Sequence, residues 1–198
     1  LASAIVTRLQ TLVSREQNPQ DPAVVTVGAI HGGAKHNIIP DEVKLQLTVR
    51  SYSDASRDGL LKGIERIARG EAIASGMPED KMPTVTIDPA FTPATYNNPA
   101  LVQRIHGVFV DWFGNGALIE RKPTMGGEDF GRYGTTEHKI PVFMFRVGSI
   151  SPAVVKRAQA AGRPLPSLHS SIYAPDPKPT ITTGITAMSA AVLDLLKK

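Results

Sequence analysis

A histidine in a short polar loop is the first residue that could bind a metal ion. His169 stands in the stretch Ser167-Leu168-His169-Ser170-Ser171, which follows a proline-rich segment. A neutral imidazole is a good ligand for zinc, nickel or manganese. One histidine does not make a site, because a catalytic zinc needs about three protein ligands. Taken alone, such a histidine is more often structural than a ligand, and the other histidines show no metal-like spacing with it.

Two acidic residues follow two glycines at Gly126-Gly127-Glu128-Asp129. Neighbouring carboxylates can bind a metal ion or act as a general acid and base. The alternative is structural, since acidic side chains also stabilise the N-terminus of a helix by facing the positive end of its dipole. The residues alone leave both interpretations open.

A glycine-containing loop follows His31 and ends at Asn37-Ile38-Ile39-Pro40. Paired glycines let backbone amides approach an anion, so a phosphate-binding loop is one interpretation. Phosphate loops lead from a strand into a helix, whereas this loop leads into a second strand at residues 43–50. A long hairpin connection is therefore favoured by the residues alone.

Hydrophobic periodicity predicts the elements that carry these loops. Polar and apolar residues alternate over residues 43–50, which places Arg50 on the polar face of a half-buried strand. Asn98 and Pro99 form an N-cap and first-turn pair for a helix. Helices are predicted at residues 2–15, 54–75, 98–114 and 185–196, and strands at residues 24–30, 43–50, 84–88, 117–120 and 142–147.

The order of these elements predicts two domains. Helix, strand, strand, helix and strand over residues 1–91 match a ferredoxin-like α+β unit that lacks its first strand. Helices that alternate with buried strands over residues 92–198 predict part of an α/β sandwich. Because Leu1 already lies in a helical pattern, we expect the chain to be a fragment that begins inside a domain.

Composition and charge exclude several classes of protein. The chain has 198 residues, of which 41% are hydrophobic and 20% charged, and this balance is typical of a globular protein. Cysteine is absent, so disulfides and thiolate metal sites are excluded. The net charge of +4 is scattered along the chain, which argues against a nucleic-acid partner. No apolar run reaches the roughly 20 residues of a membrane span, and a cytoplasmic location is expected.

Five motifs occur together in a fixed order. They are Val27-Gly28-Ala29-Ile30-His31-Gly32-Gly33, Asn37-Ile38-Ile39-Pro40-Asp41, Leu47-Thr48-Val49-Arg50, Gly127-Glu128-Asp129-Phe130 and Leu168-His169-Ser170. This set resembles the M20 peptidase family. Within the family it is most similar to the amidohydrolase branch of hippurate hydrolases, N-acyl amino acid amidohydrolases and auxin-conjugate hydrolases. The resemblance covers nearly the whole chain.

The resemblance implies an enzyme with an α/β and α+β fold. A ferredoxin-like lid, which usually also forms a homodimer, would occupy residues 1–91, and the second half of an α/β zinc-peptidase-like catalytic domain would occupy residues 92–198. Two divalent ions (zinc, manganese, nickel or cobalt) would activate a water to attack the amide bond of an N-acyl amino acid or a related small amide or peptide. The general base, a glutamate, and most metal ligands would lie in a missing N-terminal half. We therefore expect the fragment alone to be inactive.

The resemblance also implies roles for individual residues. His169 matches the last metal ligand of the family. Substrate contacts are expected from Asn37, Arg50, His31, Glu128 and Asp129. The two acidic residues would lie on the wall of the cleft and shape it rather than bind metal. No catalytic residue is expected within the chain itself.

A non-catalytic protein is the competing hypothesis. A ferredoxin-like dimerisation or ligand-binding module with an α/β extension explains the alternation over residues 43–50 and the absence of cysteine equally well. A His-x-Asp or Cys-x-His pair upstream of Leu1 in the parent gene would support the enzyme.

Overall fold

The computed structural model describes residues 1–197 and divides the chain into two compact units. The first unit consists of Leu1–Ala94 together with Pro123–Gly131, and the second consists of Thr95–Lys122 and the chain from Arg132 onward. The domain boundary at residues 91 and 92 stays a prediction, and the short segment Pro123–Gly131 belongs to the first unit although it lies beyond that boundary.

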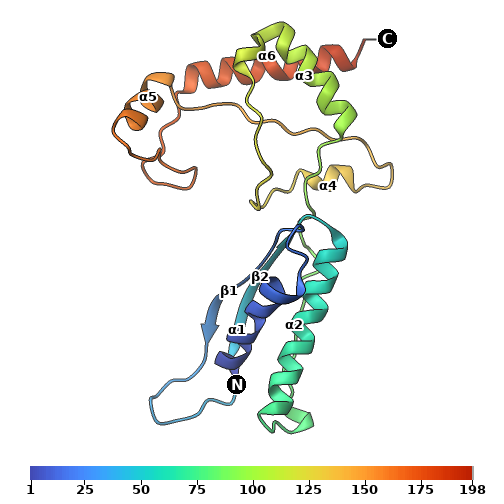
Figure 1. The fold of residues 1–198 in the computed structure, drawn as a ribbon, viewed down its shortest axis with the longest axis vertical. Helices are drawn as coiled ribbons and strands as arrows, with labels where there is room; N and C mark the ends of the chain where they lie inside the picture. The colour runs from blue at the N-terminus through green and yellow to red at the C-terminus, as the bar shows by residue number, and fades with distance from the viewer. Residues whose placement is uncertain (198) are drawn as a thin grey trace. The chain divides into compact units, whose positions relative to one another are not determined.

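The first unit is a two-stranded antiparallel sheet with two helices on one face (Figure 1). Strand β1 (Ala23–His31) pairs with strand β2 (Lys44–Ser51). The face that α1 and α2 cover carries the apolar residues of the alternating pattern. Helix α1 (Ala2–Thr11) continues through the π-helical turn η1 (Leu12–Glu16), and helix α2 (Asp54–Ala74) follows the sheet. Ser53 caps α2, because its side chain accepts a hydrogen bond from the Ser56 amide.

Apolar side chains from both helices and the sheet form the core of the first unit. Leu9 and Leu12 are 1% and 2% exposed and pack against the inner face of α2. The helices approach closely at Gly63, where an added Cβ would lie 2.4 Å from Leu12 Cδ2. The remaining buried members are Ile5, Val25, Leu60, Ile64, Ile67 and Ala68.

A β-bulge changes the phase of β1 at Gly28. Val27 pairs with Leu47, but the next register pair joins Ala29 to Gln46, so Gly28 is the extra residue. Val25 and Val27 pair with Val49 and Leu47 on the helix-facing side. Beyond the bulge the alternation reverses, and His31 pairs with Lys44 on the face opposite the helices. His31 and Arg50 therefore belong to the same face of the sheet.

The second unit is built around two helices, α3 (Pro99–Phe113) and α6 (Pro177–Leu195), which pack against each other. Ile105 and Phe109 of α3 meet Ala187 and Ala191 of α6 in a second core. The rings of Phe143 and Phe145 complete it, and the Phe109 and Phe145 centroids are 5.0 Å apart in an edge-on arrangement. Short helices η2 (Glu79–Lys81), η3 (Asn115–Ala117), α4 (Gly131–Gly134) and α5 (Pro152–Ala160) lie between the longer elements.

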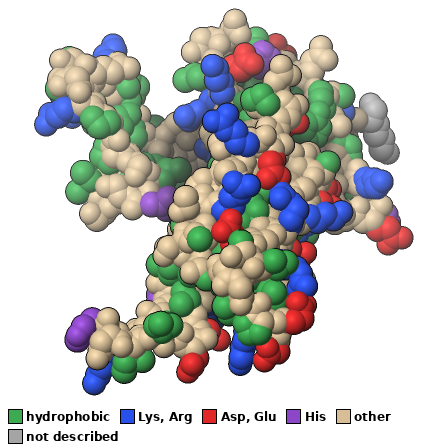
Figure 2. All heavy atoms as spheres, turned by 60° about the horizontal axis from the view of Figure 1, so that its bottom comes forward, with side chains coloured by type: hydrophobic (Ala, Val, Ile, Leu, Met, Phe, Trp, Pro, Cys, Tyr) green, Lys and Arg blue, Asp and Glu red, His purple; other side chains and the backbone are tan. Residues whose placement is uncertain are grey.

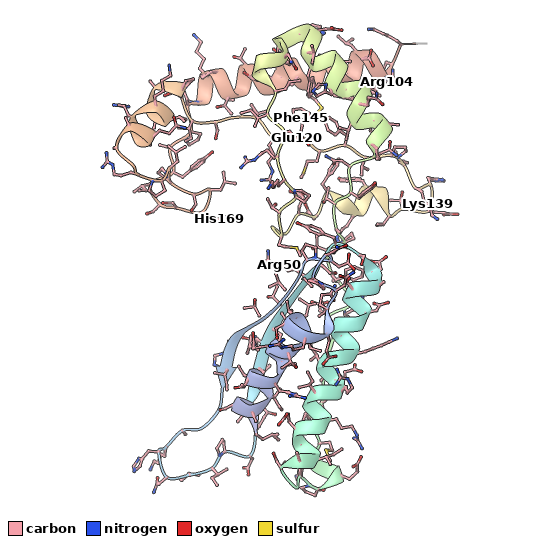
Figure 3. The ribbon with its side chains drawn as sticks, viewed as in Figure 1. Arg50, Arg104, Glu120, Lys139, Phe145 and His169 are labelled. Atoms are coloured by element: carbon pink, nitrogen blue, oxygen red, sulfur yellow. The ribbon has the colours of Figure 1, made fainter. Side chains whose placement is uncertain are left out.

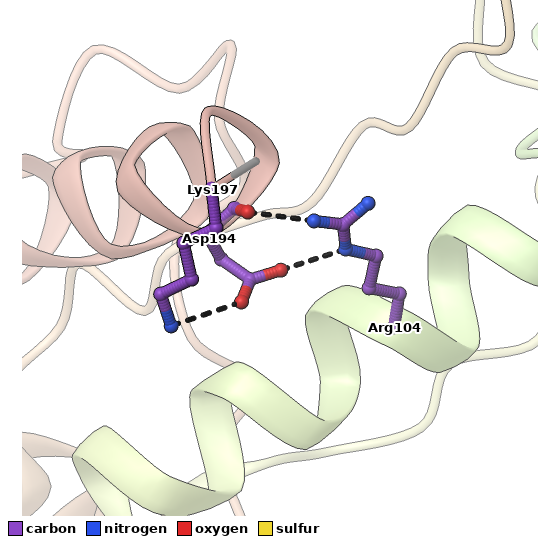
Figure 4. Close-up of polar contacts among 3 residues, drawn as sticks. All are labelled: Arg104, Asp194 and Lys197. Carbon is purple, nitrogen blue, oxygen red and sulfur yellow. Dashed lines mark hydrogen bonds and ion pairs between the residues drawn. The ribbon is translucent and has the colours of Figure 1, made fainter.

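A charged cluster joins the first half of α3 to the C-terminal end of α6 (Figure 4). The Asp194 carboxylate accepts from Arg104 Nε at 2.7 Å and from Lys197 Nζ at 3.3 Å. Arg104 Nη2 also donates to the Asp194 carbonyl at 2.6 Å. The hydrogen bond from Arg104, supported by Lys197, holds the pKa of the Asp194 carboxyl below its ordinary value against a smaller opposing effect of desolvation.

The mixed fold class is confirmed, but three predicted strands are wrong. Within the described chain the sheet contains β1 and β2 alone, and residues 84–88, 117–120 and 142–147 form no ladder. Within 142–147, the Asn97 side chain donates to the Met144 carbonyl and accepts from the Met144 amide, both at 2.9 Å, so at this residue a side chain takes both backbone groups. In a ferredoxin-like unit, the segment at 84–88 would pair with the first strand of the fold. Residues 1–197 contain no such strand.

Two helices also differ from their predictions. Helix α6 begins at Pro177, eight residues earlier than predicted from the apolar spacing, because Asp176 and Pro177 start a helix as N-cap and first residue. Helix α5 was not predicted. It buries no residue, so it leaves no clear periodic pattern in the sequence.

Candidate functional site

Arg50 links two of the motifs found in the sequence. It lies near the end of β2 on the exposed face of the sheet, as its alternation predicts. Arg50 is labelled in Figure 3. Its Nη1 donates to the carbonyl oxygen of Met125 at 2.5 Å. Met125 directly precedes Gly126 and Gly127, so this contact holds the glycine-rich segment against the strand. The structure therefore brings Arg50 to the segment that carries Glu128 and Asp129.

The two acidic residues of this segment have different surroundings. Glu128 is half-buried, and its Oε1 accepts a hydrogen bond from the Phe130 amide at 2.9 Å. This contact lies just before α4, so the carboxylate stabilises the turn that leads into the helix. Asp129 is exposed. Glu128 thus has a structural contact, and Asp129 is the more accessible of the two carboxylates.

His31 and Asn37 lie at the other end of the sheet. The register pairs His31 with Lys44, six residues from Arg50 along β2, which corresponds to about 20 Å. Asn37 lies further out, in the exposed loop that joins β1 to β2. Within this loop Gly33 has a φ of +81°, a conformation that glycine adopts without strain. His31 and Asn37 are therefore too far from Arg50 to touch the same small substrate within one chain.

His169 belongs to the second unit, in the loop between α5 and α6 (Figure 3). A turn encloses it, because the Ser170 amide donates to the Ser167 carbonyl at 3.0 Å. A second turn follows directly, with the Tyr173 amide donating to the Ser170 carbonyl at 3.1 Å. The imidazole is exposed to solvent.

The donors present fit one position of a metal centre rather than a whole centre. The imidazole of His169 has the right chemistry for a divalent transition metal and is accessible. Over residues 1–197, no three histidine, aspartate or glutamate side chains come together as a potential metal site. His169 can thus contribute a single ligand, and a complete site needs others.

Charged residues of both signs are mixed on the surface. Figure 2 shows lysine and arginine side chains interspersed with aspartate and glutamate on the face drawn. In the described part of the chain, no helix has both the length and the apolar character needed to cross a bilayer.

Two features of the site were not predicted from the sequence. The bulge at Gly28 decides the face on which His31 lies, and a glycine inside a strand pattern is a known signal for a bulge. The contact between Arg50 and the Met125 carbonyl joins residues 75 positions apart, and no local pattern announces such a contact.

Comparison with known proteins decides the family. The profile of the peptidase dimerisation domain of M20 enzymes matches residues 1–75. The chain is 38% identical over 132 residues to IAA-amino acid hydrolase ILR1-like 4 of Arabidopsis thaliana, which covers 67% of this chain and 30% of the relative. It is 37% identical over 158 residues to N-acetyldiaminopimelate deacetylase of Bacillus licheniformis, covering 76% of this chain and 38% of the relative.

This chain belongs to the M20 peptidase family. The M20 fold is also found in solved structures. The YxeP protein of Bacillus subtilis, described as a dinuclear metal binding peptidase from the M20 family, has a TM-score of 0.62 at 20% identity, covering 97% of this chain and 45% of its own. A protein of methicillin-resistant Staphylococcus aureus gives a TM-score of 0.65 at 24% identity, covering 99% and 46%. The M20 chain described here thus spans less than half the length of these relatives.

Proposed function

We propose that this chain forms the lid and the C-terminal part of the catalytic domain of a metal-dependent amidohydrolase. The substrates are N-acyl amino acids or related small amides. The contact between Arg50 and Met125 carries the proposal, because it brings an exposed guanidinium to the glycine-rich segment with Asp129. The names of two relatives, an IAA-amino acid hydrolase and an N-acetyldiaminopimelate deacetylase, support this substrate class.

Arg50 is the proposed anchor for the carboxylate of the substrate. A guanidinium carries five N–H donors, and the Met125 carbonyl engages Nη1. The remaining donors lie on a side chain that faces solvent and can form a paired contact with a carboxylate. Gly126 and Gly127 add no side chain beside the guanidinium, so a small molecule can approach it. Asp129 and Glu128, which follow these glycines in the same segment, disfavour a second negative charge there.

Asn37 and His31 are proposed to act on a second copy of the chain. Their separation of about 20 Å from Arg50 follows from the strand register. The match of residues 1–75 to a dimerisation domain supports a homodimer formed through the lid. In such a dimer the Asn37 amide would donate to the scissile carbonyl in the partner's cleft, where it stabilises developing negative charge.

His169 is proposed as one ligand of a two-ion centre, with zinc, manganese, nickel or cobalt as the metal. A bound divalent ion supplies Lewis-acid chemistry to an amide carbonyl. The other ligands and the general-base glutamate are proposed to lie outside this chain, which alone is then inactive. Helix α6 also carries a row of exposed apolar side chains, which favours the presence of a further protein segment that covers them. The row comprises Ile181, Ile185, Met188 and Val192.

The test compares free-acid and methyl-ester forms of one N-acyl amino acid with the intact enzyme. Arg50→Ala should lower kcat/KM for the free acid at least about tenfold, roughly 1.4 kcal/mol, and change kcat/KM for the ester little. Lys44→Ala is the matched control, because Lys44 lies on the same strand and the same face at the far end. Equal losses for acid and ester would show that Arg50 is structural and would remove it from the substrate site.

A further inference from the structure

A hydrogen bond between two side-chain hydroxyls tethers the loop that carries His169. The hydroxyls of Ser149 and Tyr173 are hydrogen-bonded, and both residues are half-buried. The Asp176 amide also donates to the Ser149 carbonyl at 2.7 Å. Ser149 is therefore bonded twice to the stretch between His169 and α6, once through its side chain and once through its backbone.

The chain just before Ser149 is attached to the core of the second unit. Phe145 lies four residues before Ser149, and its ring packs edge-on against Phe109. The Asn97 side chain bonds both polar backbone groups of Met144. On the other side, Ser151 begins α5 by accepting a hydrogen bond from Val154. Ser149 thus lies between a stretch that packs in the core and the start of α5.

The loop around His169, which Tyr173 ends, has little packing of its own. Leu168 and Ile172, which flank His169 and Ser170, are 67% and 73% exposed. The two successive turns order the backbone locally, but they do not attach it to the core. Tyr173 ends the second turn, and its side chain supplies that attachment. Tyr173 follows His169 by four residues, so its contact with Ser149 restrains the backbone that carries the imidazole.

We propose that Tyr173, through its hydroxyl contact with Ser149, is a positioning residue that fixes His169 for metal binding. The proposal rests on the proposed metal role of His169. Tyr173 does not touch the metal. It lowers the freedom of the loop before binding, so less order has to be gained when the imidazole takes up its ligand geometry. Outer partners that orient a metal ligand typically change metal affinity by about 10- to 100-fold.

Zinc and manganese titrations of the intact enzyme test the proposal. Tyr173→Phe and Ser149→Ala should each weaken metal affinity roughly tenfold. The double variant should lose no more than either single variant, because both remove the same contact. Tyr96→Phe is the matched control, since it removes the same hydroxyl from a tyrosine that is 72% exposed. Amide hydrogen exchange at Ser170 and Tyr173 in the metal-free enzyme should become faster in Tyr173→Phe and in Ser149→Ala but not in Tyr96→Phe.

His169→Ala separates this proposal from the proposed function. A loss of metal affinity in His169→Ala, with unchanged affinity and unchanged exchange in Tyr173→Phe, would overturn the positioning role and leave the ligand role intact. Unchanged affinity in His169→Ala would overturn the ligand role and the positioning role together. Losses in Tyr173→Phe and Tyr96→Phe of equal size would also contradict a specific tether.

Discussion

The contact between Gly63 and Leu12 makes a quantitative prediction about the first unit. An alanine at residue 63 would place its Cβ 2.4 Å from Leu12 Cδ2 and 3.5 Å from Leu12 Cγ and Cδ1. Leu12 is 2% exposed, so its side chain has little room to move. Overpacking of this kind costs about 1–3 kcal/mol, whereas glycine to alanine in a helix gains about 1 kcal/mol. We expect Gly63→Ala to be neutral or destabilising by up to about 2 kcal/mol.

Gly70 provides the matched control on the same helix. Nothing lies within 4 Å of an added Cβ at Gly70, which is exposed, so Gly70→Ala should gain the helix preference without a clash. The difference between the two variants isolates the packing cost, about 1–3 kcal/mol, in urea unfolding of the intact enzyme monitored by circular dichroism. Leu12→Val should recover part of the loss in Gly63→Ala. Gly63→Ala at least as stable as Gly70→Ala would refute the close helix approach.

Three further predictions concern the charged cluster, the second core and assembly. Because the pKa of Asp194 is lowered in the folded protein, its ion pairs add stability above about pH 4, and this stability is lost as the pH falls through the folded-state pKa. The Tm difference between wild type and Asp194→Asn should therefore shrink on acidification, and a constant difference would contradict this. Phe109→Ala should destabilise the second unit by about 3–5 kcal/mol in urea unfolding, because Phe109 is 6% exposed, and a loss below about 1 kcal/mol would exclude it from the core. Light scattering should find the intact enzyme as a dimer through the lid, and a monomer at high micromolar concentration would count against that assembly.

The elements of the first 75 residues were largely predictable because their patterns are local. Apolar spacing and alternation gave α2, β1 and β2 within one or two residues of their ends. The segment 142–147 was misjudged because an apolar run does not reveal its partner. At Met144 the partner is the Asn97 side chain rather than another strand, and it lies 47 residues away in the chain.

The sequence could name candidate site residues but could not predict how they are arranged. The alternation placed Arg50 correctly on the exposed face. Its contact with Met125 and the separation of His31 from Arg50 depend on the tertiary fold, which sequence periodicity does not encode. The roles of Asn37, Glu128, Asp129 and His169 came from the family resemblance and remain proposals.

The bulge at Gly28 divides the hairpin into two sections whose side-chain phases are independent. Insertion or deletion of one residue at this point would invert the orientation of everything between it and the loop tip, while the section paired with Arg50 kept its orientation. The hairpin can therefore change the residues it presents at its far end without disturbing the end that carries the guanidinium. A single glycine in this way lets the two ends of one strand pair vary separately.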